Sequence, residues 1–326
     1  MSRFIFRGLI LTAGVVFAVG IIVAAPRFES LRLQSIAGED VAPEEPQPTR
    51  AELVTKALAA AYPGRIERAE FRDDDWAVLM DGIWYYYAGG RLLPEELLEK
   101  AEEYSSSFGI PNYQSELPLW REPSSEQAGR FRERDSSRNN NNNDRPRAPR
   151  QRSYHFREDL WQAHSRDESH QRMKTVDFLN FSLVIHSGIA EILPYVEERI
   201  LSAAKTNRQV QSWVNNIGTA SAWSWRNIAG SQSRSYHAYG IAIDILPKSL
   251  DGKETYWQWA RERRSDWWNI PYEDRYHPPD EVVKAFEAYG FIWGGKWPYF
   301  DTMHFEYRPE VFILSGLELE TPPYPL

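Results

Sequence analysis

Ser235-Tyr-His237-Ala-Tyr-Gly240-Ile-Ala-Ile-Asp244 is the stretch that decides the fold of this chain. From Ile241 to Ile245 apolar residues alternate with Ala242 and Asp244, a pattern that predicts a strand with its isoleucines in the core. Asp244 then points to the opposite face. Gly240 permits a tight turn that folds His237 back toward Asp244, so an imidazole and a carboxylate converge.

A second stretch, Asp301-Thr-Met-His304-Phe-Glu306, repeats this alternation. As a strand it sends Phe305 into the core and places His304 and Glu306 on the other face, with Asp301 just before the strand. Two imidazoles and one carboxylate form a three-ligand set, and a catalytic zinc keeps three protein ligands plus an open position for water. A water so placed still needs a base, and either Asp301 or Glu306 can serve.

The order Ser-x-His-x-x-Gly-x-Ala-x-Asp, then Asp-x-x-His, resembles the zinc peptidases that trim peptidoglycan stem peptides. That family includes D-alanyl-D-alanine carboxypeptidases and dipeptidases and the L-alanyl-D-glutamate endopeptidases of phage endolysins. The resemblance covers residues 176–309 and implies His237, Asp244 and His304 as zinc ligands. It implies Asp301 as the general base. Many relatives carry Glu at the position of Asp301, and this chain departs from them. Glu306 is therefore kept as the alternative base.

Further segments carry the same resemblance. Trp225-Arg226-Asn-Ile-Ala-Gly230 resembles a family segment whose arginine faces the scissile carbonyl, which implies a catalytic role for Arg226. The run from Gly290 to Trp297 resembles the Gly-Phe-x-Trp-Gly-Gly-x-Trp of the endopeptidase and carboxypeptidase branch. Trp293 and Trp297 are the candidate substrate-binding residues of this run. We expect one of them to line the cleft and the other to pack. Ser235 is expected to bind substrate or to orient a ligand.

The composition argues against nucleic-acid binding and excludes cysteine as a metal ligand. The 326 residues contain 38 Lys and Arg against 46 Asp and Glu, a net charge of −8, which argues against a nucleic-acid-binding surface. The chain has no cysteine, so any metal site must use histidine and carboxylate. Four histidines fit no ligand pattern and are expected to be structural or solvent-facing: His155, His164, His170 and His186.

The N-terminus indicates export. Residues 8–25 form an 18-residue apolar run after Arg3 and Arg7, a length between that of a signal peptide and a membrane-spanning helix. We expect residues 1–25 to be a signal peptide or an N-terminal membrane anchor. Pro26 would follow the cleavage point, which favours the uncleaved inner-membrane anchor. The bulk of the chain is then expected in the periplasm or cell envelope.

Five segments are predicted after the N-terminal run. Residues 26–49 read as a Pro- and Glu-containing linker, and residues 50–118 as a small α+β domain of unknown role with a hairpin at Asp81-Gly82. Residues 119–152 carry arginines and an asparagine run, which predicts a disordered linker. Residues 153–318 are the predicted zinc peptidase domain, and residues 319–326 are a tail.

The predicted fold class is α+β, a small antiparallel sheet packed with helices and carrying a single zinc site, preceded by the small α+β unit. Within it, residues 176–204 have apolar positions at helical spacing, which predicts two helical segments broken at Pro194.

The predicted function is zinc-dependent hydrolysis of an amide bond in a peptidoglycan stem peptide, by a D-alanyl-D-alanine carboxypeptidase or an L-alanyl-D-glutamate endopeptidase. The alternative is a catalytically inactive, zinc-containing module for cell-wall binding or signalling. A third class, an envelope structural protein that works through residues 50–118, stays open. The expected partners are stem peptides and no nucleic acid.

Overall fold

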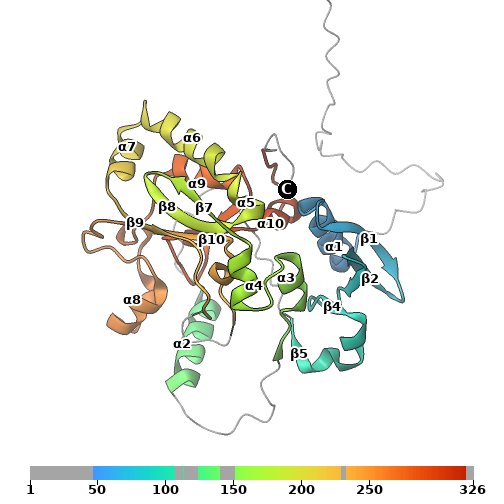
Figure 1. The fold of residues 1–326 in the computed structure, drawn as a ribbon. Coiled ribbons are helices and arrows are strands. Elements are labelled where there is room, and N and C mark those ends of the chain that lie inside the picture. The colour runs from blue at the N-terminus through green and yellow to red at the C-terminus, as the bar shows by residue number, and fades with distance from the viewer. Residues whose placement is uncertain (1–46, 107–112, 114–123, 140–150, 229–232, 321–326) are drawn as a thin grey trace, which may run out of the picture. The chain divides into compact units, whose positions relative to one another are not determined.

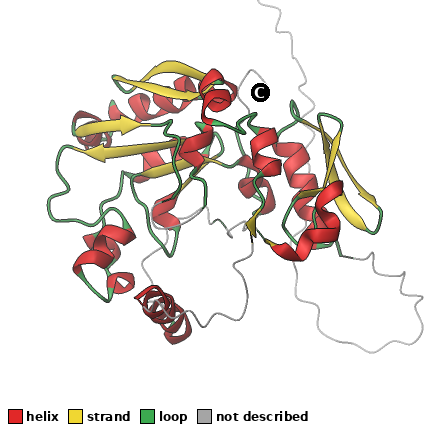
Figure 2. Ribbon diagram, turned by 60° about the horizontal axis from the view of Figure 1, so that its bottom comes forward, coloured by secondary structure: helices red, strands yellow, loops and turns green. Residues whose placement is uncertain are grey.

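The computed structural model describes residues 47–106, 113, 124–139, 151–228 and 233–320 (Figure 1). Gln47–Leu326 form one compact unit. Its fold is mixed α+β with small antiparallel sheets, and Figure 2 shows helices packed beside the strands throughout. No helix among the described residues is long and apolar enough to cross a membrane. The predicted signal peptide or anchor at 1–25 and residues 26–46 of the predicted linker at 26–49 lie outside those residues.

The N-terminal part begins with helix α1 (Arg50–Ala61), capped by Thr49, whose side chain accepts a hydrogen bond from Glu52 N. A four-stranded antiparallel sheet follows in the order β1 (Ile66–Arg72), β2 (Asp75–Met80), β3 (Ile83–Tyr86) and β4 (Leu93–Pro94). Asp81 and Gly82 have φ of 51° and 78°, the left-handed conformation that a two-residue hairpin needs. The predicted α+β character of this part and the predicted hairpin at Asp81-Gly82 are therefore confirmed.

The second sheet holds the two motifs. Its strands lie in the order β11 (Phe291–Trp293), β12 (His304–Tyr307), β10 (Ala242–Pro247) and β9 (Ile217–Ser221), and every neighbouring pair is antiparallel. The two motifs thus occupy adjacent strands at the middle of this sheet.

The remaining elements complete the unit. Two short strand pairs are β5 (Tyr104–Ser105) with β6 (Gln151–Arg152), which is parallel, and β7 (Met173–Phe178) with β8 (Phe181–His186), which is antiparallel. Apart from α2, which is described below, the other α-helices are α3 (His155–Leu160), α4 (Arg166–Gln171), α5 (Ser187–Ala190), α6 (Leu193–Ala204), α7 (Arg208–Asn215), α8 (Trp257–Arg263), α9 (Asp280–Glu287) and α10 (Pro309–Leu314). Single-turn 3₁₀ helices include η2 (Tyr236–Tyr239) and η5 (Gly294–Lys296).

The prediction of two helices over residues 176–204 is wrong for its first half. These residues form most of the β7–β8 hairpin, whose turn residues Leu179 and Asn180 have φ of 49° and 66°. Pro194 lies in the first turn of α6, where a missing backbone N–H costs nothing, so it begins a helix instead of breaking one. Short apolar runs with β-branched residues satisfy both periodicities, and here packing of Leu183 and Ile185 into the core decides for strand.

One hydrophobic cluster extends through both sheets. It contains Leu58 of α1 and Tyr85 of β3 together with Ile243 of β10, Phe286 of α9 and Phe305 of β12. Each of these side chains is at most 1% exposed. The N-terminal sheet therefore packs against the motif-bearing part of the chain through a shared core.

The predicted disorder of residues 119–152 needs correction for one segment. Ser125–Asn139 form helix α2, whose Ala128 and Phe131 share one face at i, i+3 spacing. The Phe131 ring lies 5.2 Å from the ring of Trp267 and 5.9 Å from that of Trp268. Two apolar residues are enough to anchor the helix because this aromatic partner exists elsewhere in the chain. Residues 140–150 lie outside the described residues.

His186 generates a prediction for stability against pH. Its imidazole is 8% exposed, accepts a hydrogen bond from Gly188 N at 3.0 Å and bonds Trp161 O through Nε2. Burial lowers its pKa from 6.5 to about 4. Between these values the unfolded chain binds a proton that the folded protein does not, so stability is lost as pH falls.

Acidification from pH 7 to 5 should therefore cost about 2 kcal/mol at this residue. His186→Asn preserves a cap acceptor and removes the titration, so the variant should lose less stability over this interval than the wild type. Urea unfolding of both proteins at the two pH values measures the difference. Equal losses in both would contradict this assignment.

Candidate metal centre

The β10–β12 pairing brings the two motifs together. Asp244 lies directly opposite His304 in the antiparallel register, so their side chains share one face of the sheet. On the other face, Ile243 and Phe305 are 0% and 1% exposed and belong to the core. The alternation predicted for both motif strands is confirmed.

His237 reaches this face from η2. Ser235 precedes the turn, and its hydroxyl accepts a hydrogen bond from His237 N at 3.3 Å. Gly240 ends the turn with φ of 69°, and a Cβ at this position would lie 2.4 Å from Met173 Sδ. Only glycine satisfies both the left-handed conformation and the close contact. The Ser235 hydroxyl therefore caps the turn that carries His237.

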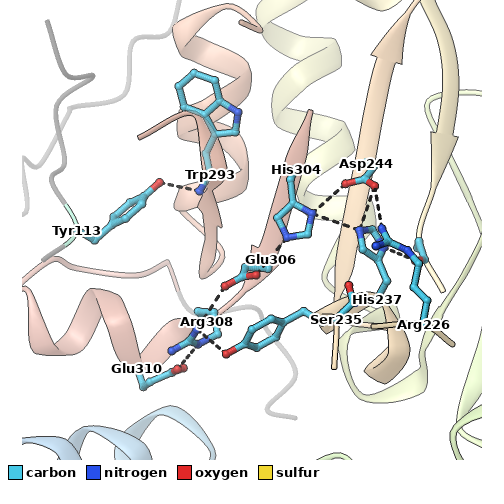
Figure 3. Close-up of polar contacts among 12 residues, drawn as sticks. Tyr113, Arg226, Ser235, His237, Asp244, Trp293, His304, Glu306, Arg308 and Glu310 are labelled. Carbon is cyan, nitrogen blue, oxygen red and sulfur yellow. Dashed lines mark hydrogen bonds and ion pairs between the residues drawn. The ribbon is translucent and has the colours of Figure 1, made fainter. Parts of the chain in front are cut away.

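His237, Asp244 and His304 converge as predicted (Figure 3). One ligand-type atom from each lies within 4.8 Å of the others. His237 Nε2 lies 3.1 Å from Asp244 Oδ2 and 3.2 Å from His304 Nδ1, and His304 Nδ1 lies 2.9 Å from Asp244 Oδ1. No other group of three such residues meets this spacing in the part of the chain that the structure describes.

Outer hydrogen bonds fix which ring nitrogen faces the centre. His237 Nδ1 donates to Ala222 O, and His304 Nε2 donates to Glu306 Oε2 at 3.1 Å. With those protons placed outward, both inward nitrogens carry lone pairs and Asp244 is an acceptor as well. Three acceptors that face one another repel unless a cation lies between them. This donor set suits a divalent zinc, and both histidines have the outer partners that zinc ligands have.

The charges agree with that role. Burial raises the pKa of Asp244, but hydrogen bonds and charge from His237 and His304 hold it well below the ordinary value. Burial lowers the pKa of His304, yet its bonds to Asp244 and Glu306 raise it well above the ordinary value. The centre therefore favours a positive charge, which a proton or a divalent cation supplies.

Asp301 lies at the edge of the centre. Its backbone N donates to Gly294 O at 3.0 Å, and a Cβ on Gly294 would lie 2.5 Å from Asp301 O, so the glycine permits this approach. Its Oδ1 is buried and receives no hydrogen bond from the described residues. Burial raises the pKa of Asp301 to about 7, while His304 lowers it and Asp244 raises it. A carboxyl with one oxygen left without a partner among the described residues, and with a pKa near neutrality, fits a proton acceptor.

Glu306 lies on the side of His304 that faces away from Asp244 (Figure 3). It is 5% exposed, and its two oxygens bond the outward nitrogen of His304 and Arg308 Nη1, the latter at 3.3 Å. Burial raises its pKa, but the hydrogen bond and charge of His304, followed by the charge of Arg308, lower it below the ordinary value. Glu306 is thus an anion that holds the His304 ring in its orientation. Its geometry does not favour the alternative role of base.

The three other predicted site residues differ in position. Arg226 Nη2 lies 3.8 Å from Asp244 Oδ2, and the Arg226 side chain is 46% exposed, so it borders the centre from solvent. The Trp297 ring centroid lies 5.7 Å from that of His304, which makes Trp297 a wall of the site. Gly230 of the arginine segment lies outside the described residues.

The predicted substrate contact of Trp293 needs correction. Trp293 is 0% exposed, stacks on Phe305 and donates from Nε1 to Thr302 O at 2.9 Å. Its backbone N donates to the hydroxyl of Tyr113 (Figure 3). Trp293 is therefore the packing member of the pair, and it supports the sheet beneath the site.

The sequence did not identify Ala222 or Arg308 as site residues. Ala222 acts through its carbonyl, which leaves no trace in residue type. Arg308 had a signal, since His304, Glu306 and Arg308 are spaced by two residues. That spacing places them on the same face of an extended chain.

Removal of one ligand tests the centre. His304→Ala should lower bound zinc from about one per chain to nearly none after dialysis, because two remaining ligands bind weakly. His164→Ala, at an exposed histidine away from the centre, is the matched control and should retain zinc. Metal analysis of the purified proteins measures both. Full zinc occupancy in His304→Ala would contradict the ligand set.

Two family models match parts of the chain. Residues 54–108 match a family described as a domain of unknown function. No solved structure matches the chain. Residues 229–307 match the family described as D-alanyl-D-alanine carboxypeptidase, and this range contains every proposed metal ligand together with Asp301 and Glu306. The match and the geometry together support a peptidase of this family for that part of the chain.

Proposed function

We propose that the protein is a zinc-dependent peptidase that hydrolyses an amide bond in peptidoglycan stem peptides. The observation that carries the proposal is the convergence of His237, Asp244 and His304, together with Asp301, whose buried Oδ1 has no partner among the described residues and whose pKa responds to the charges of His304 and Asp244. The family match supports the substrate class, since D-alanyl-D-alanine is the end of a stem peptide.

The residues divide the chemistry among them. When bound, zinc supplies Lewis acidity, which makes water a nucleophile at neutral pH. Asp301 accepts the proton of the attacking water and returns it to the leaving amine. The Asp301 pKa of about 7 would fall beside a bound divalent cation, so its carboxylate would be available as the proton acceptor at neutral pH. Arg226 donates to the carbonyl oxygen as negative charge develops there, a contact worth roughly 3 to 4 kcal/mol.

Two bonds in the stem peptide are candidates. The description of the matched family favours the D-alanyl-D-alanine bond. The glycine- and tryptophan-rich run from Gly290 to Trp297 resembles the branch that also contains L-alanyl-D-glutamate endopeptidases. An inactive zinc-containing wall-binding module is the alternative from another class. The positions of Asp301 and Arg226 at the centre favour the enzyme, because a binding module has no use for a base.

The proposal includes export to the periplasm or cell envelope, where this substrate lies. It draws on the apolar run at residues 8–25 after two arginines, which we interpret as an uncleaved anchor.

Two substitutions separate the base from the orienting carboxylate. Asp301→Asn should retain zinc and lower kcat by roughly 10²- to 10⁴-fold, because the proton acceptor is lost. Glu306→Gln should weaken zinc binding by roughly 10- to 100-fold and keep most of kcat at saturating zinc. Zinc titrations and initial rates at saturating metal measure both quantities. The opposite pattern would assign the base to Glu306.

Product analysis tests the reaction itself. The purified protein is incubated with peptidoglycan, with and without a chelator, and the products are identified by mass spectrometry. Release of free D-alanine that the chelator abolishes identifies the carboxypeptidase, and a new D-glutamate amino terminus identifies the endopeptidase. Asp301→Asn is the control and should give neither product. Zinc-loaded protein that cleaves nothing would favour the binding module.

A further inference from the structure

A buried chain of polar contacts connects the N-terminal part to the metal centre. Tyr62, which follows α1, donates its hydroxyl to Glu310 Oε2 at 2.7 Å. Arg308 Nε donates to the other oxygen of Glu310, and Arg308 Nη1 donates to Glu306 Oε1 at 3.3 Å. Glu306 Oε2 then accepts from His304 Nε2 at 3.1 Å. Figure 3 shows the part of this chain from Glu310 to His304.

Every residue in this series of polar contacts is buried. Tyr62, Arg308 and Glu306 are each 5% exposed, Glu310 is 1% exposed and His304 is 8% exposed. At this depth water cannot replace a lost partner, and charged contacts are stronger than at the surface. Loss of a hydrogen bond at one end therefore alters the position and hydrogen bonding of the next residue in the series.

Arg308 links both motifs. Besides Glu306, its Nη1 donates to the hydroxyl of Tyr236 at 2.7 Å, and Tyr236 is the residue before His237. The position of this one guanidinium thus bears on two of the three ligands. Glu310 holds the guanidinium from the far side, and the Tyr62 hydroxyl occupies the second oxygen of Glu310.

Loss of the Tyr62 hydroxyl is expected to shift Arg308 toward Glu310. The freed oxygen of Glu310 is left buried without its donor, and the nearest compensation is a bidentate bond to Arg308. That rotation draws the guanidinium away from Glu306 and Tyr236. The outward nitrogen of His304 then has a less firmly placed acceptor, which weakens the ligand.

The link joins two regions that match different families. Tyr62 lies within residues 54–108 and His304 within residues 229–307, whereas Arg308 and Glu310 lie just past the second match. The contact is therefore a property of this combination of segments in one chain.

We propose that Tyr62 is a positioning residue of the metal centre, through which the N-terminal part of the chain sets the affinity of His304 for zinc. The inference rests on the proposed metal site and assigns a role to residues near the start of the N-terminal α+β part. Tyr62 touches neither metal nor substrate and acts through Glu310, Arg308 and Glu306.

Tyr62→Phe in the full chain isolates the hydroxyl, since the edge-to-face ring contacts with Trp161 and Tyr307 remain. Tyr85→Phe is the matched control, because Tyr85 also donates to a partly buried carboxylate, that of Asp159, and Asp159 is not one of the residues that connect Tyr62 to His304. Glu310→Gln is a second variant that keeps the side-chain shape and removes the charge that holds Arg308.

Zinc affinity is measured by competition with a chromophoric chelator, and the absorption spectrum is recorded at saturating cobalt. Tyr62→Phe and Glu310→Gln should weaken zinc binding by roughly 3- to 10-fold and alter the cobalt spectrum, while Tyr85→Phe should match the wild type. Wild-type affinity and spectrum in both variants would overturn the inference. Failure of the wild type itself to bind zinc would instead overturn the proposed function.

Discussion

The structure depends on one pairing, the antiparallel contact of β10 with β12 that sets Asp244 opposite His304. This register sends Ile243 and Phe305 into the core and leaves the polar side chains together on the other face. His237 completes the group because Gly240 turns its segment back toward the sheet. Two lone-pair nitrogens and a carboxylate held so close in a buried site are stable together only around a positive charge.

The residues around His237, Asp244 and His304 have different roles, which follow from their contacts. Glu306 accepts a hydrogen bond from His304 Nε2, and the carbonyl of Ala222 accepts one from His237 Nδ1. The other nitrogen of each imidazole is therefore free to bind a cation. Asp301, whose buried Oδ1 has no hydrogen-bond partner among the described residues, is the carboxyl that remains available for proton transfer in the proposed reaction. Two carboxylates three and two residues from the same histidine thus differ in role through what they contact.

Local patterns were enough to predict the site and most of the N-terminal part. The alternation around Asp244 and His304, the turn at Gly240 and the hairpin at Asp81-Gly82 are all properties of a few neighbouring residues. What the sequence missed depends on distant partners. Phe131 orders a helix only because Trp267 and Trp268 receive it, and Trp293 is buried because Phe305 and Thr302 lie beside it.

The central claim is that His237, Asp244 and His304 bind one divalent metal ion, and anomalous diffraction at the zinc edge from crystals of the zinc-loaded protein tests it most directly. The account predicts a single strong peak at about 2.0 to 2.2 Å from His237 Nε2, His304 Nδ1 and an oxygen of Asp244. A peak elsewhere, or none at this position in protein that contains zinc, would contradict it.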